Sequence, residues 1–159
     1  MQLTFDSGAT SKFVPLQYHV HAPSEHTIDG YSCDLEMHFV HLYEDGSLGA
    51  VIGVMFDRIK GGNHDSFMIE QMLPIFDTQA NVKQTTGHDQ FIGSFLHSLD
   101  YSEFWSYDGS LTTPPCTEGI KWSVLKTVQP ISDRQIKHFN DLWKSNNDFA
   151  QGAGNNRET

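Results

Sequence analysis

Residues 17–41, QYHVHAPSEHTIDGYSCDLEMHFVH, hold five of the nine histidines of this chain. Residues 14–21 and 35–43 are rich in β-branched and aromatic side chains and are separated by Pro, Ser, Asp and Gly, which predicts two strands. The apolar run 48–56, which follows a turn at residues 44–47, predicts a third strand that is buried. The three segments together predict a meander.

The histidines sort by strand face, because side chains alternate along a strand. His19 and His21 lie two residues apart and share a face, whereas His41 lies three residues beyond His38 and faces the other way. A His-x-His pair alone is more typical of ordinary surface or core histidines than of a metal site. A meander can bring His38 beside the pair, and three histidines from adjacent strands suit a Zn²⁺ ion with one open position.

Two polar side chains can support these histidines. Gln17 lies two residues before His19, and Glu36 lies two residues before His38, on the same faces as their neighbours. A ligating histidine usually donates its other ring proton to a carboxylate or carbonyl oxygen. We therefore expect Gln17 and Glu36 to orient the candidate ligands.

The rest of the chain alternates further strands and helices. Residues 104–107 and 121–128 are expected to be strands, and residues 91–99 are ambiguous. Asp65 or Ser66 can cap a helix that runs to about Phe76, with Phe67 and Ile69 on its apolar side. Ser132 can cap a second helix through residue 143, and the polar tail after Lys144 shows no structural pattern.

Composition bounds the class of protein. The 159 residues fit one domain, residues 1–159, and the net charge of −10 argues against nucleic acid and anionic membranes as partners. The longest apolar run, about residues 49–56, is far shorter than the ~20 residues that a membrane span needs. No signal peptide is visible at the N-terminus. The two cysteines cannot form a multi-bridge framework.

A second motif, YDGSLTTPPCTEGIKW, occupies residues 107–122. On its own it is a constrained loop rich in hydroxyl groups. Pro114 and Pro115 fix their own φ angles and restrict Thr113, so a rigid turn would account for the motif without any catalytic role.

Together, the segments HVHAPSEHTIDG, DLEMHFVH and YDGSLTTPPCTEGIKW resemble the α-class carbonic anhydrases in order and spacing. The direct APSEH connection is more similar to bacterial, plant and protist members than to vertebrate ones. The resemblance implies a mainly β fold with a few helices (α+β), built on a large, twisted, mostly antiparallel sheet with zinc at the base of a cavity. It covers the middle of the family's domain, so we expect a chain truncated at both ends.

The resemblance also implies an activity, the reversible hydration of CO2 to bicarbonate and a proton by zinc-bound hydroxide, which makes the protein a lyase. His19, His21 and His38 become the Zn²⁺ ligands, with Gln17 and Glu36 as their supports. Thr112 would accept a hydrogen bond from the hydroxide and donate one to Glu25. Since a hydroxyl has one proton to give, committing it to Glu25 leaves a lone pair for the nucleophile.

The remaining implied roles concern the substrate and the scaffold. Thr113 lies beside the substrate site, and an apolar wall for CO2 is formed by Val40, Val51, Leu111, Ile120 and Trp122. His26 and Tyr107 form a structural hydrogen-bonded pair, and His41 is a buried structural histidine. The residue that carries the proton to solvent is not assigned, because the family's usual shuttle histidine precedes the segment matched here.

Compartment and alternative functions stay open at this point. Cys116 resembles a position that, in secreted relatives, bonds to a cysteine outside this chain, which favours a secreted or extracytoplasmic protein. Cys33 is an extra cysteine, and a Cys33–Cys116 bridge is a further option. The alternative function is a carbonic-anhydrase-like binding or structural module with lost or reduced catalysis, acting within a larger chain or assembly. A zinc hydrolase would need a separate general-base motif such as His-Glu-x-x-His, which the chain lacks.

Overall fold

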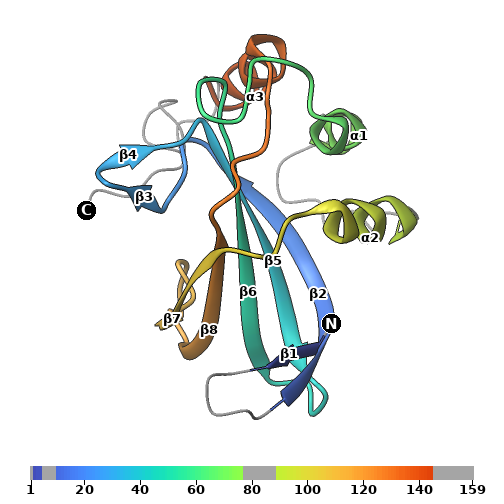
Figure 1. Cartoon of the computed structure of the whole chain (residues 1–159), viewed down its shortest axis with the longest axis vertical. Helices are drawn as coiled ribbons and strands as arrows, with labels where there is room; N and C mark the ends of the chain where they lie inside the picture. The colour runs from blue at the N-terminus through green and yellow to red at the C-terminus, as the bar shows by residue number, and fades with distance from the viewer. Residues whose placement is uncertain (1, 5–9, 77–88, 145–159) are drawn as a thin grey trace.

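The fold is a six-stranded mixed sheet with helices packed on one face (Figure 1). The structure, a computed structural model, describes residues 2–4, 10–76 and 89–144. The strand order is β1-β2-β5-β6-β8-β7, and every neighbouring pair is antiparallel except β6 and β8. The strands are β1 (Gln2–Thr4), β2 (Thr10–His21), β5 (Leu35–Tyr43), β6 (Leu48–Phe56), β7 (Phe104–Ser110) and β8 (Glu118–Leu125). A separate hairpin consists of β3 (Thr27–Ile28) and β4 (Tyr31–Ser32).

The predicted meander is confirmed, since β2, β5 and β6 are sequential antiparallel neighbours in the sheet. Two of its strands have the predicted bounds. Strand β2 begins four residues earlier than predicted, because the polar residues around Lys12 pair with β1 although they show no apolar alternation. The later strands also differ from their predicted bounds. Strand β7 begins at Phe104 as predicted but continues to Ser110, and β8 begins earlier than predicted, at Glu118, which pairs with Ser110.

Three helices follow the meander: α1 (Phe67–Phe76), α2 (Asp89–Ser98) and α3 (Asp133–Lys144). The ambiguous segment 91–99 is thus mostly helical. The predicted apolar side of α1 was partly wrong, because Phe67 is 70% exposed while Met68 is buried. The predicted member Ile69 is buried, and it forms the buried stripe together with Met68, Met72 and Leu73.

The two faces of the sheet carry different contents. All three helices pack on the face that presents Val20, Met37, Phe39 and Ile52, and together they form the larger apolar core. The opposite face carries a smaller apolar cluster, which we call the Trp122 cluster. Its buried members are Cys33, Val40, Val51, Met55, Ile120, Trp122 and Val124. Because helices cover only one face, polar groups can gather on the other.

A buried glutamine links the start of helix α3 to the start of helix α1 through hydrogen bonds. Gln135 of α3 is fully buried, and its Oε1 accepts a hydrogen bond of 2.9 Å from the backbone N–H of Ser66, just before α1. Its Nε2 donates to the Ser66 carbonyl at 3.0 Å and to Glu70 at 3.1 Å. The Ser66 N–H would otherwise be buried without an acceptor, whereas the Ser66 carbonyl also accepts the backbone N–H of Glu70 at 3.0 Å.

We expect Gln135→Leu to lower the free energy of unfolding by about 1–3 kcal/mol, since it leaves the buried backbone N–H of Ser66 without its acceptor. Urea unfolding followed by circular dichroism measures this change. Lys137→Ala on the exposed side of α3 is the matched control and should stay within about 0.5 kcal/mol, because its ion pair with Asp141 is exposed to solvent. Equal effects from the two variants would contradict the assignment.

No helix in the described ranges has the length and apolarity needed to cross a membrane. Cys33 is buried, Cys116 is exposed, and both are free thiols, so a Cys33–Cys116 bridge is not formed. The predicted lack of pattern after Lys144 falls outside the described residues.

Candidate metal centre

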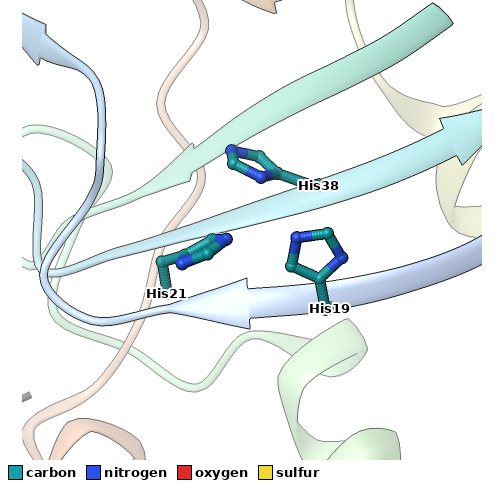
Figure 2. Close-up of side chains that lie close together, drawn as sticks. All are labelled: His19, His21 and His38. Carbon is teal, nitrogen blue, oxygen red and sulfur yellow. The ribbon is translucent and has the colours of Figure 1, made fainter. Parts of the chain in front are cut away.

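Strand register places the three candidate histidines side by side on the face that the helices leave open. His19 of β2 pairs with His38 of β5, and His21 pairs with Glu36. Directly paired residues of antiparallel strands point to the same face at a Cβ separation of about 5 Å. Figure 2 shows the rings of His19, His21 and His38 turned toward one another from two adjacent strands.

One ring nitrogen from each histidine lies within 4.8 Å of the other two. The ring centroids of the three pairs are separated by 4.9, 5.1 and 4.6 Å. His21 and His38 are buried, and His19 is half-buried. The cluster therefore offers three imidazole lone pairs from the rigid centre of the sheet, with the half-buried His19 on its outer side.

The ring of His19 is held neutral. Burial, helped by the nearby ring of His38, lowers its pKa to about 4, although the carboxylate of Glu36 opposes the shift. The Nδ1 atom of His19 lies 3.0 Å from Oε1 of Gln17. An amide oxygen only accepts hydrogen bonds, so Nδ1 donates and the lone pair of Nε2 is left free.

Glu36 is the centre of a second set of contacts. Its side chain is fully buried, and its Oε1 lies 2.8 Å from His38 Nε2 and 2.6 Å from His26 Nδ1. Its Oε2 accepts a third bond, 2.9 Å long, from the backbone N–H of His26. Burial alone would raise the pKa of this carboxyl, but the bonds from His26 and His38 hold it well below its usual range. The carboxylate is thus charged and accepts hydrogen bonds from both rings. Because His38 donates through Nε2, the free lone pair of its ring is on Nδ1.

The chain of hydrogen bonds continues to β7. Tyr107 OH lies 2.6 Å from His26 Nε2. Burial, together with the negative charges of Glu36 and Glu25, raises the pKa of Tyr107 to about 12, so the phenol keeps its proton. Because His26 Nδ1 donates to Glu36, His26 Nε2 accepts the hydrogen bond that Tyr107 OH donates. The expected pairing of His26 with Tyr107 is present, and Glu36 joins it to His38.

The residues predicted to form an apolar wall lie in one cluster beside the histidines. Val40, Val51, Ile120 and Trp122 are buried there, and Leu111 packs against them half-buried. Val40, Val51 and Trp122 are directly paired across β5, β6 and β8. The Trp122 ring centroid lies 4.8 Å from that of His38. The apolar surface is therefore contiguous with the candidate ligands.

Thr112 and Thr113 lie in the loop between β7 and β8. This loop is closed by backbone hydrogen bonds from Leu111 N to Thr117 O (3.0 Å) and from Cys116 N to Thr113 O (2.9 Å). Thr112 is half-buried and Thr113 is exposed. Glu25 is largely buried, and its Oε2 lies 3.5 Å from Nε2 of His21, so this carboxylate borders the histidine cluster. The bond from Thr112 to Glu25 stays a prediction.

His41 lies apart from the cluster. It is buried, and it pairs with Ala50 of β6 and Pro15 of β2. Its Nδ1 donates a hydrogen bond of 2.9 Å to the Phe39 carbonyl. Burial lowers the pKa of this ring. The position agrees with the face predicted from the sequence.

One residue near the cluster was not predicted from the sequence. Gly53 of β6 pairs directly with His38 on one side and with Val124 on the other. A Cβ atom at this position would lie 3.0 Å from Glu36 Oε1. A glycine inside a buried strand often marks a close approach, and that signal was available in the apolar run 48–56.

Sequence comparison identifies the family. A profile of the eukaryotic-type carbonic anhydrases matches residues 2–159. The chain is 37% identical to alpha carbonic anhydrase 3 of Arabidopsis thaliana over 126 residues, covering 79% of this chain and 44% of the relative. It is 38% identical to a carbonic anhydrase of Pectobacterium atrosepticum over 147 residues, covering 89% of this chain and 57% of the relative. The chain thus spans about half the length of these curated relatives.

Solved structures agree with this result. An α-carbonic anhydrase from Thermovibrio ammonificans, in complex with the inhibitor sulfanilamide, matches with a TM-score of 0.70 and 32% identity, covering 94% of this chain and 59% of that one. A fungal α-carbonic anhydrase from Aspergillus oryzae matches with a TM-score of 0.72 and 26% identity, covering 95% and 59%. From the matched profile and these relatives, the chain belongs to the eukaryotic-type (α) carbonic anhydrase family.

Proposed function

We propose that this chain binds one zinc ion through His19, His21 and His38 and hydrates CO2 reversibly to bicarbonate and a proton. The observation that carries the proposal is the convergence of three imidazole nitrogens on the sheet face that the helices leave open. Alpha carbonic anhydrases are zinc-dependent, and the donor set fits the ion, because zinc binds neutral imidazole nitrogens in a tetrahedral arrangement with a fourth position for the reactants. The lowered pKa of His19 keeps its ring neutral and ready to bind.

When bound, zinc lowers the pKa of a coordinated water to about 7, a value known from carbonic anhydrase itself, and so supplies a nucleophile at neutral pH. The chain's own residues do the rest. Gln17 and Glu36 accept hydrogen bonds from Nδ1 of His19 and Nε2 of His38. These bonds fix the tautomers, so that the other ring nitrogen of each histidine directs its lone pair at one point. His26 and Tyr107 hold Glu36 in place from behind.

Thr112, Glu25 and Thr113 complete the reactive side of the site. Thr112 accepts a hydrogen bond from the nucleophile and donates one to Glu25, so the attacking lone pair points at the substrate carbon. Thr113 lies beside the substrate. The Trp122 cluster and Leu111 provide an apolar surface for CO2, which carries no charge and needs no charged anchor.

The setting of the domain belongs to the same proposal. Residues 1–159 act as part of one carbonic-anhydrase domain, which a larger chain or assembly completes. The Cys116 pattern favours secretion, and the exposed position of this thiol leaves it accessible to a partner cysteine.

The test uses the purified 159-residue chain. Zinc content is measured by atomic absorption, and CO2 hydration is followed by stopped flow with and without an aryl sulfonamide. We expect stoichiometric zinc and activity that the sulfonamide abolishes. Zinc without hydration would favour the alternative of a non-catalytic module, and the absence of zinc from folded protein would refute the ligand assignment.

A further inference from the structure

We propose that Gly53 is a positioning residue of the zinc site: the absence of a side chain there gives the Glu36 carboxylate the room it needs to hold His38. The inference rests on the proposed function, because it concerns the same ligand. Gly53 touches no reactant and acts only through Glu36.

The backbone does not require glycine at this position. Within residues 2–4, 10–76 and 89–144, the glycines with positive φ are Gly30, Gly46, Gly62 and Gly119, so Gly53 has a backbone that any residue can adopt. It lies in the interior of β6, between β5 and β8. A glycine in such a strand weakens it, since the residue loses more conformational freedom on folding and packs no side chain. Something other than strand stability therefore accounts for it.

The position that a side chain at residue 53 would occupy explains why this residue is a glycine. A Cβ atom at this position would meet Glu36 Oε1 at 3.0 Å, whereas its contacts with the Val124 methyl groups, at 3.4 and 3.7 Å, would be ordinary. The carboxylate is therefore the obstacle. Its Oε1 is the atom shared between His38 Nε2 (2.8 Å) and His26 Nδ1 (2.6 Å).

The carboxylate has little freedom to move aside. Oε2 is held by the backbone N–H of His26 at 2.9 Å, and the side chain is fully buried. A methyl group at residue 53 would have to push Oε1 away by a few tenths of an ångström, and the shared bonds would lengthen. The ring of His38 would then lose the partner that fixes its orientation.

We expect Gly53→Ala to weaken zinc binding about tenfold, near the lower end of the 10–100-fold range typical of changes to outer partners of metal ligands, a range that includes carbonic anhydrase itself. Zinc affinity is measured by competition with a chromophoric chelator. In the metal-free protein, we also expect the downfield imidazole N–H proton signals of His38 and His26 to shift or disappear, because these protons lie in the bonds to Glu36.

The matched control is Gly49→Ala in the same strand. A Cβ at Gly49 would lie 2.8 Å from the ring of Phe13, away from the histidines, so this variant should lower the melting temperature without changing zinc affinity. If both variants weaken zinc binding equally, general strain in β6 is the cause and the inference is wrong.

A double-variant cycle isolates the carboxylate. In a Glu36→Ala background, Gly53→Ala should change zinc affinity by less than about twofold, because the carboxylate through which it acts is gone; such non-additivity is expected of residues in direct contact. An undiminished effect in that background would overturn the inference, as would wild-type affinity and imidazole signals in the single variant. If Gly53→Ala alone fails to fold, a folded double variant supports the inference and an unfolded one refutes it.

Failure of the proposed function gives a different pattern. Wild-type protein that binds no zinc would remove the enzyme assignment, but the imidazole signals of the metal-free protein would still report whether a methyl group at residue 53 displaces Glu36.

Discussion

Replacing His38 with alanine is expected to weaken zinc binding by more than about 100-fold and to abolish CO2 hydration. His38 is 1% exposed and pairs directly with His19, so its removal takes one of three ligands from the middle of the cluster. Loss of an outer partner alone costs 10–100-fold, and loss of a ligand should cost more. Chelator competition measures the affinity, and circular dichroism checks the fold.

His41→Ala is the matched control, because the two histidines lie on the same strand, are both buried and face opposite ways. It removes a hydrogen bond to the Phe39 carbonyl and should lower stability by about 1–3 kcal/mol, while zinc affinity stays unchanged. If zinc affinity falls equally in the two variants, the site is not formed by the His38 face of the sheet.

Thr112→Ala should leave zinc bound and slow CO2 hydration by about 10²–10³-fold. The proposed hydroxyl acts on the transition state alone, and losses of this size follow when one preorganised hydrogen bond of that kind is removed. Stopped-flow hydration of the zinc-loaded variant gives the rate, and the chelator assay gives the affinity. The two readouts should separate, unlike those of the His38 variant.

Thr117 provides the comparison for this loop. Its side chain is exposed, and its contribution to the loop is the backbone carbonyl that accepts from Leu111 N at 3.0 Å, which alanine retains. Thr117→Ala should therefore hydrate CO2 at the wild-type rate. Unchanged turnover in Thr112→Ala would remove that hydroxyl from the mechanism, whereas equal losses in both variants would indicate a general disturbance of the loop.

Local patterns predicted the strands that carry the histidines. The period of two along β2 and β5 is a local property, and it correctly placed His19 on the face of His21 and separated the face of His38 from that of His41. Strand β6 was equally visible as an unbroken apolar run. Where the pattern was weak, the bounds were wrong: the start of β2 depends on pairing with β1, which residues around Lys12 do not reveal.

Helix α1 shows how a small error in an element's start changes its buried face. The expected apolar side included Phe67, but that residue is the first of the helix and points to solvent. Each residue turns a helix by about 100°, and the core of the sheet selects the stripe that begins at Met68. Packing against the sheet therefore decided which residues at the start of the helix are buried.

By itself, the sequence determined which histidines share a face, because alternation along a strand is local and needs no partner. The tertiary structure alone decided that Glu36 serves both His38 and His26, that Tyr107 supports them from 81 residues beyond His26, and that Gly53 leaves space for the shared carboxylate. These contacts join three strands, β5, β6 and β7, with the loop that follows β2. They depend on strand order and register, including the parallel pairing of β6 with β8, which exist only once the chain has folded.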